Sequence, residues 1–169
     1  MSTQKFSAHQ LATAGVIAAI YAALTLLLPI PSYMGVQFRV AEALTILPFL
    51  FPEAVLGLTA GCFLANLFGS PLVLDWIFGT LATLLAALWT SRIKNRWLAP
   101  LPPVICNALI VGAEVAFFMT REGGAFVPAF LLNACTVGLG EALSCFLLGS
   151  LLLRALEQIP SLRQRVRSI

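Results

Sequence analysis

The sequence of 169 residues has few charged side chains and a single histidine, His9. Only 10% of its residues are Asp, Glu, Lys or Arg, whereas an ordinary soluble domain carries roughly a quarter. Hydrophobic residues make up 60%, so there are too few ionisable side chains to cover a globule in water. This composition excludes a soluble protein and predicts an integral membrane protein.

Several chemical signatures are also missing from the sequence. His9 precedes the first apolar run, which argues against a histidine-based metal site or catalytic dyad. The sequence has no GxxxxGK[ST], HExxH or GxSxG motif, which argues against P-loop ATP binding and hydrolysis. No cysteine pair is spaced as CxxC, and each cysteine lies inside an apolar run as a packing residue: Cys62, Cys106, Cys135 and Cys145. We therefore expect no enzyme, no metal and no cofactor.

The apolar runs predict an all-α bundle of six transmembrane helices forming a single membrane domain over residues 1–169. Prolines and glycines separate the runs, and the second and third form two short helices joined by a tight turn at Pro52. The predicted helices are Leu11–Leu28, Val40–Phe51, Ala54–Phe68, Leu72–Trp89, Leu101–Met119 and Phe126–Leu153.

The basic residues indicate how this bundle is oriented. With the N-terminus in the cytoplasm, only Arg39 and Arg121 fall on the outer side. This positive-inside pattern predicts cytoplasmic N- and C-termini in a multi-pass protein. It also explains the net charge of +3 without nucleic acid as a partner. The basic C-terminal tail is expected to lie against anionic membrane lipid.

Polar residues inside the apolar runs form the candidate binding site, because an ionisable residue in a membrane usually faces the bundle interior. The predicted topology places Arg39 and Glu42 at the outer level and Glu141 near the middle of the membrane. A pocket open to the outside and capped by residues 31–38 is therefore expected. Its excess of acids favours a cation or a ligand rich in hydrogen-bond donors. The candidates are Arg39, Glu42, Asn66, Asp75, Trp76, Glu114, Asn133 and Glu141.

Simpler interpretations exist for several of these residues. Arg39 and Glu42 are three residues apart and can pair with each other along a helix. Asp75 can be stabilised by the dipole at the start of its helix. Trp76 can be an aromatic side chain at the membrane interface as readily as a stacking platform.

The first helix carries small residues at a period of four. Ala14, Ala18 and Ala22 form one stripe, and Gly15, Ala19 and Ala23 form a second one beside it. Such spacing allows another helix to approach closely. The neighbour can be a helix of the same bundle or a helix of a partner subunit.

Four strings of the sequence together resemble the QueT family: QFRVAEALTILPFLFPEAVLGLTAGCFLANLFG (37–69), LDWIFGTLATLLAAL (74–88), PPVICNALIVGAE (102–114) and LNACTVGLGEAL (132–143). The similarity covers nearly all of the chain from the first helix onward.

This resemblance implies a six-helix substrate-binding subunit (S component) of an energy-coupling factor (ECF) importer in a prokaryotic cytoplasmic membrane. It implies uptake of a queuosine precursor, chiefly the deazapurine 7-aminomethyl-7-deazaguanine. The implied partners are a membrane scaffold (T) subunit and two ATPase subunits, with Ala14, Ala18 and Ala22 docking on the scaffold. Two alternatives remain open: an S component for another vitamin-like compound, and a homodimeric proton-coupled transporter using Glu114 or Glu141.

The chemistry of that ligand leads to a hypothesis for each candidate. Glu114 or Glu141 would hold the guanine-like edge, because a carboxylate accepts two adjacent N–H donors. Glu42 or Asp75 would meet the ammonium group. The remaining polar atoms and the ring would be contacted by Asn66, Asn133 and the stacking residue Trp76.

Overall fold

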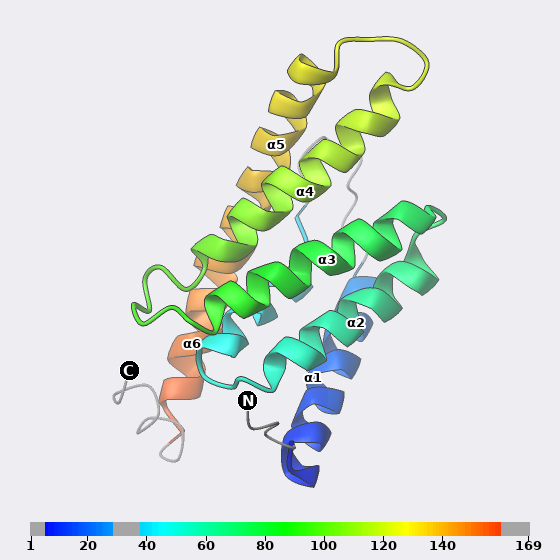
Figure 1. Cartoon of the computed structure of the whole chain (residues 1–169). Coiled ribbons are helices and arrows are strands. Elements are labelled where there is room, and N and C mark those ends of the chain that lie inside the picture. The colour runs from blue at the N-terminus through cyan, green and yellow to red at the C-terminus, as the bar shows by residue number, and fades with distance from the viewer. Residues whose placement is uncertain (1–5, 29–37, 160–169) are drawn as a thin grey trace, which may run out of the picture.

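The computed structural model describes residues 6–28 and 38–159, and within them every regular element is helical. The chain runs through six helical stretches, because the last three elements follow one another without a break (Figure 1). The elements are α1 (Ala8–Leu27), η2 (Val40–Phe49), α2 (Ala54–Gly69), α3 (Val73–Thr90), α4 (Leu101–Thr120), α5 (Phe126–Ala142), η3 (Leu143–Gly149) and α6 (Ser150–Glu157).

The helical stretches agree with those expected from the apolar runs, with shifts of a few residues at their ends. The first helix begins earlier than predicted because Ser7 and Gln10 form a reciprocal cap. The Gln10 backbone N–H donates to Ser7 Oγ at 3.2 Å, and the Ser7 N–H donates to Gln10 Oε1 at 3.0 Å. In the described residues, four helical stretches are long and apolar enough to cross a membrane: α1, α3, α4 and the continuous stretch Phe126–Glu157.

The other two helices are shorter than a bilayer is thick. The 16 residues of α2 extend about 24 Å, and the 10 residues of the 3-10 helix η2 extend about 20 Å, against a hydrocarbon core of about 30 Å. Pro48 lies inside η2, and nearly all of the helix is buried. A short helix that is almost wholly buried is a core element, and a complete crossing by η2 or α2 remains a prediction.

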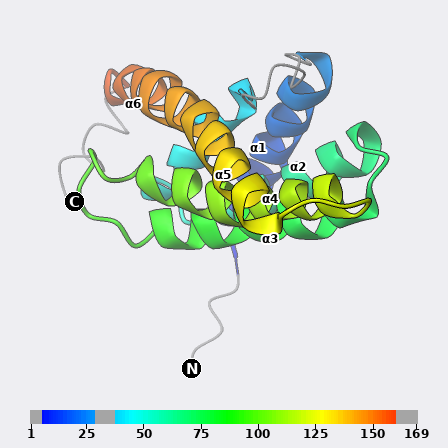
Figure 2. The ribbon, with the colours of Figure 1, turned by 90° about the horizontal axis from the view of Figure 1, so that it is seen from above.

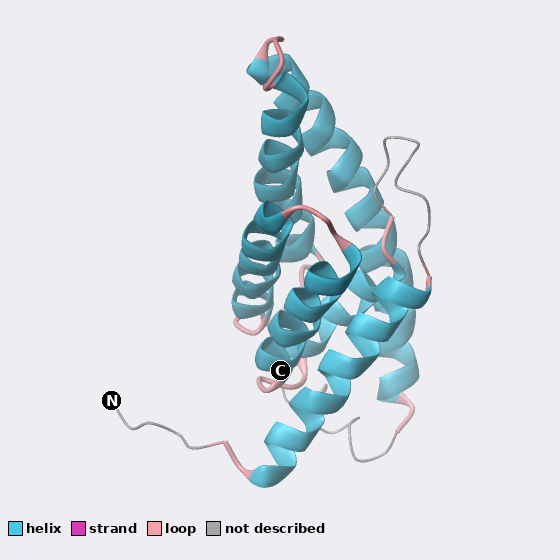
Figure 3. Cartoon of the chain, turned by 90° about the vertical axis from the view of Figure 1, so that its right-hand side faces the viewer, coloured by secondary structure: helices cyan, strands magenta, loops and turns pink. Residues whose placement is uncertain are grey.

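From α2 through α5, each helix packs antiparallel against the next one in the chain. α1 and α2 pack parallel, because Gly57 and Gly61 lie against Ala14 and Ala18 in the same order. η2 lies between α1 and η3. In Figure 1, α1 begins and α6 ends at one end of the bundle, opposite the turn between α4 and α5. Seen from above, α5 crosses diagonally over α3 and α4 (Figure 2). In Figure 3 the α4–α5 hairpin extends beyond the turn that joins α2 to α3.

Helices α1 and α2 pack closely at two glycines of α2. A Cβ atom at Gly57 would come within 2.6 Å of the Ala14 carbonyl oxygen, and one at Gly61 within 2.7 Å of the Ala18 carbonyl oxygen. Any side chain at either glycine would force the helices apart. Ala14 and Ala18 are accordingly buried in the protein's own core, 5% and 8% exposed.

This packing corrects the expectation that Ala14, Ala18 and Ala22 dock on a partner. The first two are covered by α2, and Ala22 is partly buried against the same core. The second stripe, Gly15, Ala19 and Ala23, is the exposed one. A Cβ atom at Gly15 would meet nothing within 4 Å. The period of four correctly predicts close packing, but it does not distinguish the stripe that packs inside the bundle from the stripe that faces outward.

Candidate functional site

Four polar residues from three parts of the chain line one small cavity inside the bundle. Arg39 precedes η2, Glu42 lies in its first turn, Asn107 is on α4 and Glu141 is on α5. We call these four residues the central cluster. Glu42, Asn107 and Glu141 are only 2%, 5% and 5% exposed. Buried charges are costly unless paired, so their convergence makes the central cluster the candidate functional site.

Glu42 is held from α1. The Tyr21 hydroxyl donates a hydrogen bond to Glu42 Oε1, and Tyr21 itself is completely buried. The other carboxylate oxygen, Oε2, is buried and has no hydrogen-bond partner. A buried acceptor without a hydrogen bond is energetically unfavourable. A donor on water or on a ligand would therefore stabilise it.

Arg39 supplies the positive charge of the central cluster. Its guanidinium interacts electrostatically with Tyr21, Glu42 and Glu141. In the described part of the chain the one ion pair joins Arg96 to Glu157 at 3.3 Å, so Arg39 and Glu42 do not form the simple pair considered above. Arg39 instead lines the cavity with both glutamates.

Glu141 is positioned by the helix that carries it and by α4. Cys145 Sγ lies 3.7 Å from Glu141 Oε2 and also donates to the Glu42 carbonyl oxygen at 3.5 Å. The thiol therefore links the two segments that carry the acids. Asn107 lies within reach of the Glu141 carboxylate on the opposite side.

The cavity between these residues is closed in this structure, with a volume of about 10 Å³, room for about one water molecule. Glu42 lies beside Cys145, about one turn from Glu141, and accepts a hydrogen bond from Tyr21, which is six residues before the end of α1. Arg39 is extended (φ −119°, ψ 118°) directly before η2. The outer level expected for Arg39 and Glu42 remains a prediction.

The loop expected to cap the pocket, residues 31–38, lies outside the described residues except for Phe38, which is half-buried. That part of the expectation remains a prediction.

A second polar group gathers where α2 turns into α3. The Asn66 amide nitrogen donates to the Asp75 carbonyl oxygen at 3.0 Å. A Cβ atom at Gly79 would lie 2.7 Å from this amide, so the glycine makes the approach possible. The Ser70 hydroxyl donates to the Asp75 carboxylate, and the Trp76 indole N–H donates to the Ser70 carbonyl oxygen at 3.1 Å.

These hydrogen bonds give Asn66, Asp75 and Trp76 structural partners. Asp75 lies in the first turn of α3, in agreement with the helix-dipole interpretation. None of the three lines the central cavity. The structure therefore places these three residues at the turn between α2 and α3, apart from the central cluster.

Asn133 lies apart from both groups. Its amide nitrogen donates to the Ala129 carbonyl oxygen of its own helix at 2.8 Å and contacts Met119 Sδ at 3.3 Å. The side chain is thus occupied near the start of α5. The structure does not bring it to the central cluster.

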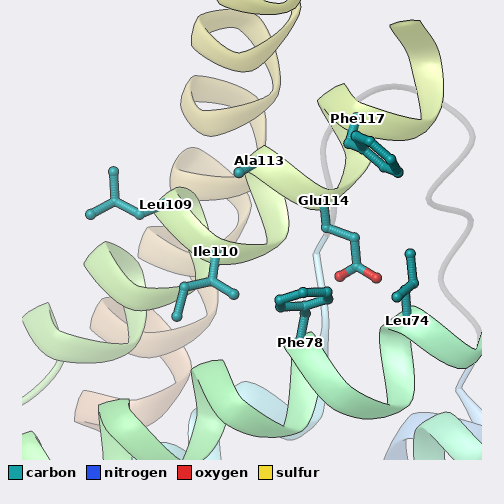
Figure 4. Close-up of a pocket in the computed structure, with 7 residues that line it drawn as sticks. All are labelled: Leu74, Phe78, Leu109, Ile110, Ala113, Glu114 and Phe117. Atoms are coloured by element: carbon teal, nitrogen blue, oxygen red, sulfur yellow. The ribbon is translucent and has the colours of Figure 1, made fainter. Parts of the chain in front are cut away.

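Glu114 lines a different cavity, a groove between α3 and α4 (Figure 4). The groove has a volume of about 610 Å³, and among the described residues that line it Glu114 is the one with a carboxylate, between apolar walls. Figure 4 shows the carboxylate between Phe78 and Leu74. It also faces the Asp75 carboxylate. We call this cavity the α3–α4 groove, formed by Leu74, Phe78, Leu109, Ile110, Ala113, Glu114 and Phe117.

Sequence reasoning missed three residues of the central site. Tyr21 and Cys145 contact the acids directly, and Thr83 lines the cavity. Each lies in an apolar run, where it looks like an ordinary packing residue. A signal was present only for Tyr21, because a tyrosine hydroxyl in the middle of a membrane helix needs a hydrogen-bond partner.

The family model for the QueT transporter matches residues 11–158 of this chain. The queuosine precursor transporter QueT of Lactococcus lactis subsp. cremoris (strain MG1363) is 30% identical over 153 residues, covering 85% of this chain and 90% of that protein. No solved structure matches the chain. The chain therefore belongs to the QueT transporter family, as the sequence strings indicated. With four helical stretches long and apolar enough to cross a membrane, it is a multi-pass membrane protein.

Proposed function

We propose that this member of the QueT transporter family is the S component of an ECF importer and that it binds the queuosine precursor 7-aminomethyl-7-deazaguanine. The name of its Lactococcus relative supports a queuosine precursor as the substrate class. The observation that carries the proposal is the convergence of Glu42 and Glu141 with Arg39 and Asn107.

The charges of the central cluster suit a cationic ligand. The cluster contains two carboxylates and one guanidinium, so a ligand with a single ammonium group would balance the charge of the buried site. A neutral ligand of the same shape would leave one carboxylate without a counter-charge. This difference supports selection of the aminomethyl compound over an uncharged analogue.

Each acid has a distinct role in this proposal. Glu141 accepts the paired N–H donors of the guanine-like edge in bidentate fashion, with Asn107 beside it to bond a further polar atom. Glu42 receives the ammonium group at Oε2, the oxygen without a hydrogen-bond partner. Arg39 is close to both acids and orients them.

The outer residues have supporting roles in the proposal. Asp75 provides a first electrostatic attraction for the cation near the entrance. Asn66 and Trp76 shape the turn through which the ligand passes, while Asn133 and Glu114 stay outside the bound complex. Because the closed cavity holds about one water, ligand binding has to separate η2 from α3, α4 and α5.

Ligand titration of the purified protein by thermal shift or tryptophan fluorescence tests this assignment. We expect saturable binding of 7-aminomethyl-7-deazaguanine, weaker binding of its nitrile analogue, and no binding of riboflavin. Binding of riboflavin alone would point to an S component for another compound. If the folded protein bound none of the deazapurines, the substrate assignment would be wrong.

The energy for uptake comes from partner subunits in this proposal, because the sequence has no P-loop. The exposed stripe of α1, formed by Gly15, Ala19 and Ala23, docks on the T subunit by close helix packing. Two ATPase subunits then drive reorientation of the whole S component. Both of its termini face the cytoplasm of a prokaryotic cell.

Uptake measurements with and without the partners test the transport mechanism. Ala19→Leu should abolish uptake by the assembled importer while leaving ligand affinity unchanged. Ala60→Leu, the same substitution at an exposed position of α2, serves as the matched control and should preserve uptake. Equal uptake by both variants would contradict docking on this stripe. Proton-driven uptake in vesicles that contain this subunit alone would support the proton-coupled alternative.

A further inference from the structure

The α3–α4 groove combines an apolar channel with one buried carboxylate. Leu109 and Phe117, on its walls, are 53% and 51% exposed, so the groove opens on the surface of the bundle. Apolar side chains are exposed on that surface, as is typical of a surface that faces lipid in a multi-pass membrane protein. The groove is therefore accessible to molecules dissolved in the bilayer.

Glu114 is the unusual residue in this groove. Its side chain is only 7% exposed, and its Oε1 atom is buried without a hydrogen-bond partner. The carboxylate lies between Phe78 and Leu74 and interacts with the side chain of Asp75. Among the described residues, the one positive charge that acts on it is that of Arg39, which is shared with the acids of the central cluster. A hydrogen-bond donor that carries a positive charge would satisfy both the unpaired oxygen and the two facing acids.

The position of Glu114 along α4 also indicates how a ligand would lie. The carboxylate is about 9 Å from the end of α4 at Thr120, a depth typical of the boundary between headgroups and acyl chains. From there the apolar wall continues toward the middle of the helix at Ile110 and Leu109. A charged end near Glu114 and an apolar tail directed inward match the orientation of a phospholipid in that leaflet.

We propose that the α3–α4 groove binds a membrane phospholipid whose headgroup carries a primary ammonium. The ammonium donates to Glu114 Oε1 beside Asp75, and one acyl chain lies along Phe78, Leu109 and Ile110. A quaternary headgroup has the same charge but no N–H donors, so it leaves the buried oxygen unpaired. The residues that line this site are different from those that line the central cavity.

Native mass spectrometry of the full chain in detergent, with added dioleoyl phosphatidylethanolamine or dioleoyl phosphatidylcholine, tests this proposal. We expect the ethanolamine lipid to bind at least fivefold more tightly, and Glu114→Gln to remove that preference. Glu122→Gln, which makes the same charge change on an exposed loop, should retain the preference. Equal binding of the two lipids by the wild type would overturn the proposal.

A second variant tests the groove itself without altering charge. Ala113→Phe places a ring in the partly open groove and should reduce binding of both lipids, with the melting temperature of the protein measured alongside. If a folded Ala113→Phe protein kept the wild-type preference, the lipid would bind elsewhere and the proposal would be wrong. Each variant is also titrated with 7-aminomethyl-7-deazaguanine. Unchanged affinity for this compound separates failure of the lipid site from failure of the substrate assignment.

Discussion

The central cluster and the α3–α4 groove both contain a deeply buried glutamate, but they differ in space and in partners. The central cavity has a volume of about 10 Å³ and brings together two acids, an arginine and an asparagine. The groove has a volume of about 610 Å³ and surrounds Glu114 with apolar side chains. Thus the polar side chains gather in the central cluster, whereas the larger cavity is the α3–α4 groove.

This difference shows why volume alone does not identify the site for a polar ligand. Helix movements can widen a small cavity, whereas they cannot supply donors and acceptors that the walls lack. A planar, cationic compound needs several polar contacts to compensate for leaving water. The central cluster provides them from η2, α4 and α5, while the groove suits an amphiphile with one charged end.

The strongest test of this contrast is Glu141→Gln. Loss of a buried charge that faces ligand donors should weaken binding of 7-aminomethyl-7-deazaguanine by roughly a hundredfold. Isothermal titration calorimetry measures the effect, with Glu122→Gln as the control for a change of charge at an exposed position. If Glu141→Gln bound the ligand as tightly as Glu122→Gln, the central cluster would not be the substrate site.

A smaller effect is expected for Tyr21→Phe. This substitution removes the hydroxyl that donates to Glu42 and leaves the ring in place. Losing a hydrogen bond to a charged group should weaken ligand binding by about tenfold, because Glu42 loses its fixed orientation. Thr25→Val is the matched control, since it removes a hydroxyl one turn away that bonds only to its own helix. Similar affinities for the two variants would show that Tyr21 has only a packing role.

The smallest effect is expected for Glu114→Gln. Because Glu114 lines the groove and not the central cavity, its neutralisation should change substrate affinity by less than about threefold. The same titration measures this change. If Glu114→Gln lost as much substrate affinity as Glu141→Gln, Glu114 would belong to the substrate site. The distinction between the two regions would then be wrong.

Much of the fold could be predicted from the sequence. The positions of proline and glycine predicted the helix ends to within a few residues, because these residues end helices for local steric reasons. The rule that intramembrane acids face the interior correctly identified Glu42 and Glu141 as buried residues. The shortness of η2 was visible as well, but not its position as a core element.

The parts that could not be predicted depend on long-range packing. Glu42 comes to lie beside Tyr21 of α1 and Cys145 of η3, which are distant in the sequence. The choice between the two small-residue stripes of α1 depends on Gly57 and Gly61 of another helix. Glu114 lines the groove because of the way α4 is oriented about its own axis. The apolar run in the sequence does not indicate this orientation. None of these contacts between distant parts of the chain can be predicted from a local pattern in the sequence.

The most direct test of the central claim compares the affinities of 7-aminomethyl-7-deazaguanine and its nitrile analogue in three proteins: wild type, Glu42→Gln and Glu141→Gln. The account predicts that the wild type prefers the aminomethyl compound by at least about tenfold, as one charge-assisted hydrogen bond would give. It predicts that Glu42→Gln removes this preference and that Glu141→Gln weakens both ligands while retaining it. An unchanged preference in Glu42→Gln would contradict the claim that the central cluster recognises the charge of the ligand.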